Sequence, residues 1–147
     1  FAMVLLATAS HPQFEVSRLE LELPGPSYTL HTVRRFREEL PKDDLYFITG
    51  ADAILEILTW HRHEDLIQEC EFIAATRPGY DLDRLRAVLP EHYLPRVRTV
   101  AAPWVDISST QIRQRLTAGE PIRYLLPEPV EQYLRKHCLY GLEEPGA

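Results

Sequence analysis

The feature that most constrains the fold is an alternation between short apolar runs and amphipathic helical stretches. The clearest apolar run, residues 45–49 (LYFIT), is continuous, which is typical of a parallel strand buried on both faces. Two more runs of strand-forming residues follow at 71–77 (EFIAATR) and 96–102 (RVRTVAA). Because helical periodicity separates these runs, the chain is predicted to form an α/β fold with a mainly parallel sheet.

The spacing of apolar side chains predicts helices before, between and after these strands along the chain. They occupy residues 2–7, 28–40, 54–58, 66–67, 81–89, 108–117 and 127–140. Ser27 or Thr29 is expected to cap the second helix, and Gly119 to end the sixth. One more strand is expected at 14–21 (FEVSRLEL), where apolar and polar residues alternate.

Size and charge narrow the class of protein. A chain of 147 residues with 45% hydrophobic residues suits one domain, expected at 1–140, followed by a tail at 141–147. No apolar run approaches the roughly 20 residues that cross a bilayer. A net charge of −6 argues against a broad nucleic-acid surface. Cys70 and Cys138 have no metal or redox spacing, so we expect reduced thiols in a cytoplasmic protein.

Small and charged residues follow each predicted strand. Gly50 and Asp52 follow the first, Arg77 stands at the end of the second, and residues 107–113 (ISSTQIR) lie beyond the third. Ligands of parallel α/β sheets collect at the carboxyl ends of the strands. The sequence therefore predicts a binding site from these segments.

The segment ISSTQIR has two interpretations that its own sequence leaves open. Ser108 or Ser109 can simply cap a helix. Alternatively, free N–H groups at the helix start bind phosphate, and Arg113 adds a bidentate contact one turn later.

Three other segments are equally ambiguous. Gly50 and Asp52 form either a turn with a helix cap or a ribose contact, and Trp60 is either a core residue or a platform for a flat ring. Arg77 is either a surface charge or a phosphate ligand, before a turn in which Gly79 is expected to adopt a positive φ. The spacing of His61 and His63 suits a metal only within a strand, so no metal site is predicted.

Taken in order, six segments resemble bacterial nicotinate-nucleotide adenylyltransferases over almost the whole chain. They are GPSYTLHT, YFITGAD, TWH, RPGY, ISSTQIR and PIRYLLPEPVEQYL. The resemblance implies a Rossmann-like nucleotidyltransferase fold. It also implies transfer of AMP from ATP to nicotinate mononucleotide, giving deamido-NAD and pyrophosphate in NAD biosynthesis, with Mg²⁺ carried on the ATP.

The resemblance also assigns roles to residues. On the ATP side it implies Gly50, Asp52, Ile107, Ser108, Ser109, Thr110 and Arg113. On the side of the nicotinate nucleotide it implies Thr29, Trp60, His61 and Arg77. Trp60 would stack on the pyridine ring, and the backbone N–H groups of Thr29 and His61 would hold the carboxylate. Many relatives have tyrosine in place of His61.

One part of the family pattern is missing. The family begins with a strand and a loop that resembles G-G-T-F-D-P-x-H-x-G-H, and neither is present in these 147 residues. No catalytic residue is therefore assigned. Since the sequence opens on Phe1 inside a predicted helix, we expect it to be the downstream part of a longer protein, in which the missing strand is central to the sheet.

Several alternatives stay open. The acceptor could be nicotinamide mononucleotide or phosphopantetheine, or the chain could be a nucleotide-binding module without catalysis. A DNA-binding helix at 109–116 (STQIRQRL) is disfavoured by the acidic charge. The expected partners are ATP and nicotinate mononucleotide, with no nucleic acid and no membrane, and homo-oligomerisation stays open.

Overall fold

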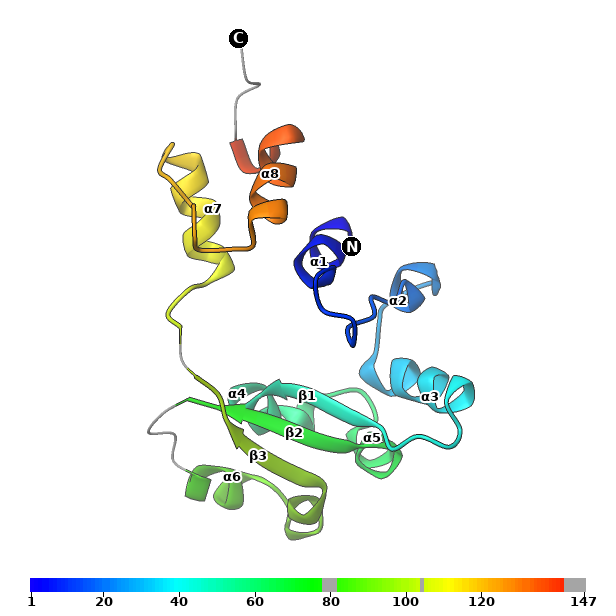
Figure 1. Cartoon of the computed structure of the whole chain (residues 1–147). Helices are drawn as coiled ribbons and strands as arrows, with labels where there is room; N and C mark the ends of the chain where they lie inside the picture. Colours follow the sequence, from blue (N-terminus) through cyan, green and yellow to red (C-terminus); the bar gives the residue numbers. More distant parts are fainter. Residues whose placement is uncertain (78–81, 104, 142–147) are drawn as a thin grey trace. The chain divides into compact units, whose positions relative to one another are not determined.

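The computed structural model describes residues 1–77, 82–103 and 105–141 (Figure 1). They fall into two compact units. One comprises the described residues of 19–103 and holds the sheet, and the other combines residues 1–18 with 105–141.

The sheet of the first unit has three parallel strands, β1 (Tyr46–Gly50), β2 (Glu71–Thr76) and β3 (Val97–Ala101). They lie in the order β1-β2-β3, with Ile48 paired to Ile73 and Ile73 to Arg98. The predicted parallel α/β sheet is confirmed. Among the described strands, β2 lies between β1 and β3, and all three carboxyl ends point to the same side.

Helices and short helical turns fill the connections of this unit. They are α2 (Leu19–Glu22), α3 (Thr29–Glu39), α4 (Ala51–Leu55), η1 (Ile57–Thr59), α5 (His63–Glu69), α6 (Leu82–Val88) and η2 (Glu91–Arg96). Their apolar side chains bury a common core that includes Leu30, Ile54, Leu66, Phe72 and Tyr93. This core supports the loops at the strand ends.

The expectation that β1 is buried on both faces is wrong. Its exposure alternates: Phe47 packs against the core, whereas Ile48 on the opposite side is 69% exposed. Val100 of β3 lies on that same side of the sheet and is also exposed. In the described chain, the helical core covers the Phe47 face, so an apolar run in β1 does not mean two buried faces.

Two local predictions in this unit are also wrong. Residues 14–18 have no regular structure and Leu19–Glu22 forms a helical turn, so the strand at 14–21 is absent. Alternating residues form a strand only when a neighbouring strand takes up their backbone hydrogen bonds. Neither Ser27 nor Thr29 caps α3, because Tyr28 holds the N-cap position and Thr29 is already inside the helix.

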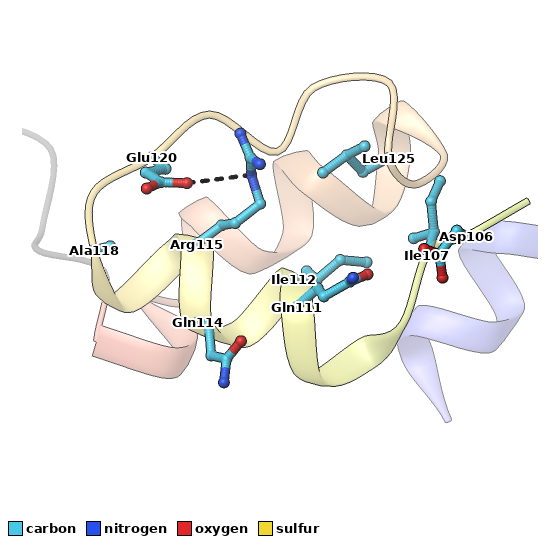
Figure 2. Close-up of a pocket in the computed structure, with 9 residues that line it drawn as sticks. All are labelled: Asp106, Ile107, Gln111, Ile112, Gln114, Arg115, Ala118, Glu120 and Leu125. Atoms are coloured by element: carbon cyan, nitrogen blue, oxygen red, sulfur yellow. Dashed lines mark ion pairs between the residues drawn. The ribbon is translucent and has the colours of Figure 1, made fainter.

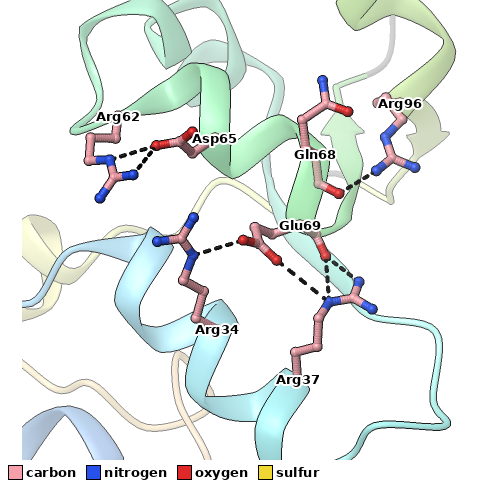
Figure 3. Close-up of polar contacts among 7 residues, drawn as sticks. All are labelled: Arg34, Arg37, Arg62, Asp65, Gln68, Glu69 and Arg96. Carbon is pink, nitrogen blue, oxygen red and sulfur yellow. Dashed lines mark hydrogen bonds and ion pairs between the residues drawn. The ribbon is translucent and has the colours of Figure 1, made fainter.

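The carboxyl end of α5 is held by arginines from outside the helix (Figure 3). Arg96 donates from Nε to the Ile67 carbonyl at 3.0 Å and from Nη2 to the Gln68 carbonyl at 2.7 Å. Arg37 of α3 donates from Nε to the Glu69 carbonyl at 3.1 Å. These cations satisfy carbonyls that a helix end leaves open, and so fix α5 against α3 and η2.

The second unit is helical, with α1 (Ala2–Thr8), α7 (Ser109–Thr117), α8 (Glu128–Lys136) and η3 (Leu139–Gly141). Its own core contains Leu116, Ile122, Val130 and Leu134. Gly119 follows α7 at a φ of +69°, which confirms it as the helix stop. Across the described residues of both units, no helix has the length and apolar character needed to span a bilayer.

Candidate functional site

Gly50 ends β1 and begins α4. Its φ of −68° and ψ of 147° are open to any residue, so the backbone does not require glycine here. Apart from the two chain neighbours, a Cβ atom at this position would meet no atom of the described residues within 4 Å. Space above the backbone at the carboxyl end of a strand is where a ligand could approach closely.

Asp52 and Arg77 meet at this same edge of the sheet. The Asp52 carboxylate lies 3.7 Å from Arg77 Nη2, although the residues follow different strands. The predicted meeting of these two strand ends is therefore confirmed. Both side chains are largely exposed, so the pair adds little to stability and its groups face solvent. Gly79, in the turn after Arg77, lies outside the described residues.

Trp60 is partly buried and packs edge-on against two phenylalanines. Its ring centroid lies 5.8 Å from that of Phe47 and 6.5 Å from that of Phe72. The interpretation of Trp60 as a core residue is therefore confirmed. Because the ring is anchored on one side and only partly covered, a stacking role is compatible with this packing.

Next to Trp60, a cluster of three rings was not predicted. His61 stacks on Tyr28 with centroids 4.2 Å apart, and His31 stands edge-on to both rings at 5.7 Å. Tyr28 and His31 are three positions apart at the start of α3, which places them on one face of the helix. That spacing was the available signal in the sequence. The contact with His61 depends on the tertiary fold.

Thr29 is the first residue of α3, between the two ring-bearing positions. Among the described residues, no side chain caps this helix, and the His31 N–H already donates to the Tyr28 carbonyl at 2.9 Å. The first-turn donors without a cap acceptor are therefore those of Thr29 and Leu30. Such groups suit an anionic oxygen. Thr29 is thus placed where a backbone donor to a carboxylate would be useful.

In the other unit, Ser108 caps α7 through a reciprocal capping box. The Gln111 N–H donates to Ser108 Oγ at 3.2 Å, and the Ser108 N–H donates to Gln111 Oε1 at 3.0 Å. The interpretation as a capped helix start is therefore confirmed. Helix geometry leaves the N–H groups of Ser109 and Thr110 without intrahelical acceptors, so capping and anion binding are compatible here.

Arg113 lies one turn into α7. Its Nη2 is 3.4 Å from Thr110 Oγ1, and both side chains are exposed. On the adjoining face, Ile107, Gln111 and Arg115 line a pocket of about 410 Å³ (Figure 2). Arg115 Nε lies 3.6 Å from the Glu120 carboxylate at one end of the group of residues that line the pocket. Arg113, by contrast, is exposed to solvent, and its contact with Thr110 places its guanidinium near the N–H groups of Ser109 and Thr110.

Comparison with known proteins relates these features to a family. The cytidylyltransferase-like family model matches residues 1–115. A probable nicotinate-nucleotide adenylyltransferase of Moorella thermoacetica is 55% identical, over 99% of this chain and 71% of its own. The chain belongs to the nicotinate-nucleotide adenylyltransferase family. Within this family, a Thermoanaerobacter protein of the same description is 45% identical, over 98% of this chain and 70% of its own.

A solved structure agrees with the fold of the nicotinate-nucleotide adenylyltransferase family. It is a Plasmodium falciparum nicotinic acid mononucleotide adenylyltransferase complexed with APC, and it matches with a TM-score of 0.62 at 23% identity. The match covers 83% of this chain and 62% of that one. The resemblance found in the sequence and the α/β nucleotidyltransferase fold are thus both confirmed.

Proposed function

We propose that this chain transfers the AMP part of ATP to nicotinate mononucleotide, forming deamido-NAD and pyrophosphate in NAD biosynthesis. The supporting observation is the 55% identity, over 99% of the chain, to a protein described as a probable nicotinate-nucleotide adenylyltransferase. The free thiols of Cys70 and Cys138 suit a cytoplasmic enzyme.

On the ATP side, the start of α7 is proposed to receive phosphate oxygens. Ser109 and Thr110 offer backbone donors, and Arg113 offers a guanidinium one turn later. Ile107 precedes them and lines the adjoining pocket, and Ser108 orders the helix end as its cap. Donors that are fixed in place before the ligand arrives stabilise charge without reorganisation.

In the sheet unit, the open space at Gly50 and the exposed carboxylate of Asp52 are proposed to accept the ribose of ATP. An acidic residue beyond a strand end can accept hydrogen bonds from ribose hydroxyls. Arg77, which lies 3.7 Å from Asp52, is proposed to pair with the phosphate of the acceptor.

For the nicotinate group, the proposed contacts are the backbone N–H groups of Thr29 and His61 and the face of Trp60. A carboxylate only accepts hydrogen bonds, so it matches two N–H donors. An amide would present its own NH₂ to a donor and leave one group unpaired. The site therefore favours the acid over the amide.

The chemistry needs no covalent enzyme intermediate. A phosphate oxygen of nicotinate mononucleotide attacks the α-phosphorus of ATP, the new P–O bond forms, and pyrophosphate leaves with the electrons of the broken bond. Such transfers depend on positioning and charge neutralisation. Among the described side chains, no cluster of three His, Cys, Asp or Glu could hold a metal ion. Mg²⁺ is proposed to enter with ATP as part of the substrate, because phosphate oxygens and water are ligands that it prefers.

The test is to incubate the intact protein with MgATP and nicotinate mononucleotide and to identify products by mass spectrometry. Deamido-NAD and pyrophosphate in equal amounts are expected. Parallel reactions contain nicotinamide mononucleotide or phosphopantetheine. Preferential adenylation of either would identify a different acceptor, and ATP binding without product would indicate a non-catalytic module.

A further inference from the structure

The cluster of Tyr28, His31 and His61 brings two ionisable rings beside the backbone positions proposed to hold a carboxylate. His31 and His61 are both exposed, and their ring centroids are 5.7 Å apart. Tyr28 holds the N-cap position of α3, just before Thr29. Its ring stacks on the His61 ring with the centroids 4.2 Å apart. The rings therefore meet where α3 begins and where the segment after Trp60 passes it.

We propose that His31, together with His61, forms a proton-dependent subsite for the carboxylate of the acceptor and so helps to set its preference for nicotinate over nicotinamide. This inference rests on the proposed function of the chain. It adds a side-chain contribution to the two backbone donors. His31 becomes a specificity residue, because its charge would act on the one group by which the two acceptors differ.

The charged groups around the cluster support this role because most are already paired. On α3, Arg34 pairs with Glu69 at 2.7 Å, and Arg35 pairs with Glu38 at 3.1 Å. Neighbouring elements also carry Arg62, which pairs with Asp65 on α5, and Glu20, which accepts from the Thr32 hydroxyl. Glu22 of α2 and Glu64 of α5 are further acidic residues on these elements. Protonation of His31 or His61 therefore adds positive charge to a surface whose other charges are largely balanced.

A pocket of about 420 Å³ borders the cluster on the α3 side. Its lining includes Tyr28, His31 and Arg35, whereas His61 is not among its described lining residues. Histidine is the side chain whose ordinary change of charge falls between about pH 5 and pH 8. Acid should therefore strengthen binding of the acceptor that carries the carboxylate, and should leave binding of the amide unchanged.

The experiment measures the dissociation constants of nicotinate mononucleotide and nicotinamide mononucleotide for the intact protein by calorimetry at pH 6.0 and 8.0. Both acceptors carry the same phosphate, so its titration cancels in the ratio of the two constants. The preference for nicotinate is expected to be about threefold greater at pH 6.0, as suits one or two exposed charges. His31→Gln should remove most of this pH dependence, and His31→Lys should hold the preference high at both pH values.

His92→Gln is the matched control, because His92 is an exposed histidine of the same unit that contacts Tyr93 rather than the cluster. It should keep the pH dependence. A preference that is equal at pH 6.0 and 8.0, or that His31→Gln leaves pH-dependent, overturns the proposed subsite. The same samples are assayed for deamido-NAD. If the preference depends on pH but no product forms, the subsite stands and the proposed enzyme activity is rejected. If product forms but the preference does not depend on pH, the enzyme activity stands and the subsite is rejected.

Discussion

The hydroxyl of Tyr93 lies 2.7 Å from Nδ1 of His63, and this bond joins η2 to the start of α5. Tyr93 is 1% exposed, so its hydroxyl depends on this partner. His63 follows the segment that carries Trp60 and His61. The bond therefore anchors one side of the proposed acceptor site to the core.

Tyr93→Phe should lower the free energy of unfolding by about 1 kcal/mol, because it removes one hydrogen bond and leaves the half-buried His63 without this partner. Urea denaturation at pH 7 measures the change. Tyr124→Phe is the control, because Tyr124 is 86% exposed and removal of its hydroxyl should have little effect on stability. Equal stability of the two variants would show that the bond contributes nothing.

Alkaline pH should destabilise the protein through Cys70. Burial raises the pKa of the Cys70 thiol from 9.0 to about 11. Because the folded-state pKa lies above the value of 9.0, the contribution of Cys70 to the free energy of unfolding is complete below pH 9. It declines as the pH rises towards 11. By linkage, the loss at pH 10.5 is about 2 kcal/mol.

Cys70→Ala separates this effect from other alkaline titrations. The variant should be less stable at pH 8, because it loses a buried side chain, but its stability should fall less between pH 8 and 10.5. Tyr93, whose pKa is also raised by burial, retains its own contribution in both proteins. Parallel curves for the variant and the parent protein would contradict the assignment to Cys70.

Substitutions at Ser108 and Arg113 of α7 are expected to affect different properties, stability at Ser108 and activity at Arg113. Arg113→Ala should reduce kcat/KM for ATP by roughly tenfold to a hundredfold, as expected for loss of a charge-assisted bond to phosphate, without changing stability. Ser108→Ala should instead lower stability by about 1 kcal/mol through loss of the cap. Steady-state kinetics and urea denaturation of both variants test this. An Arg113 variant with normal ATP kinetics would leave ISSTQIR as a helix cap alone.

The intact protein should prefer nicotinate over nicotinamide mononucleotide by at least about tenfold in kcat/KM at pH 7. Trp60→Ala should weaken both acceptors and preserve most of this ratio, because stacking does not distinguish an acid from an amide. Its packing on Phe47 and Phe72 means that it should also reduce stability. Trp60→Phe keeps an aromatic ring and serves as the control. Equal kcat/KM values for the two acceptors would refute the preference.

Local sequence determined much of this protein. Short runs rich in β-branched, aromatic and apolar residues predicted β1, β2 and β3, because such side chains favour strands and the runs are too short for helices. Ser108 and Gly119 marked the two ends of α7, since caps and stops depend on backbone geometry within one turn. The ordered motifs identified the family, which the comparisons then confirmed.

Only the tertiary structure decided the features that depend on distant partners. The alternation at 14–21 predicted a strand, yet no described strand pairs with this segment, and Leu19–Glu22 forms a helical turn instead. Ile48 belongs to an apolar run but is exposed, because burial depends on which face the helices cover. His31 and His61 are separated by 30 positions and meet only because α3 packs beside α5. Local propensity acts over a few residues, whereas burial and ring contacts are set by the packing of whole elements.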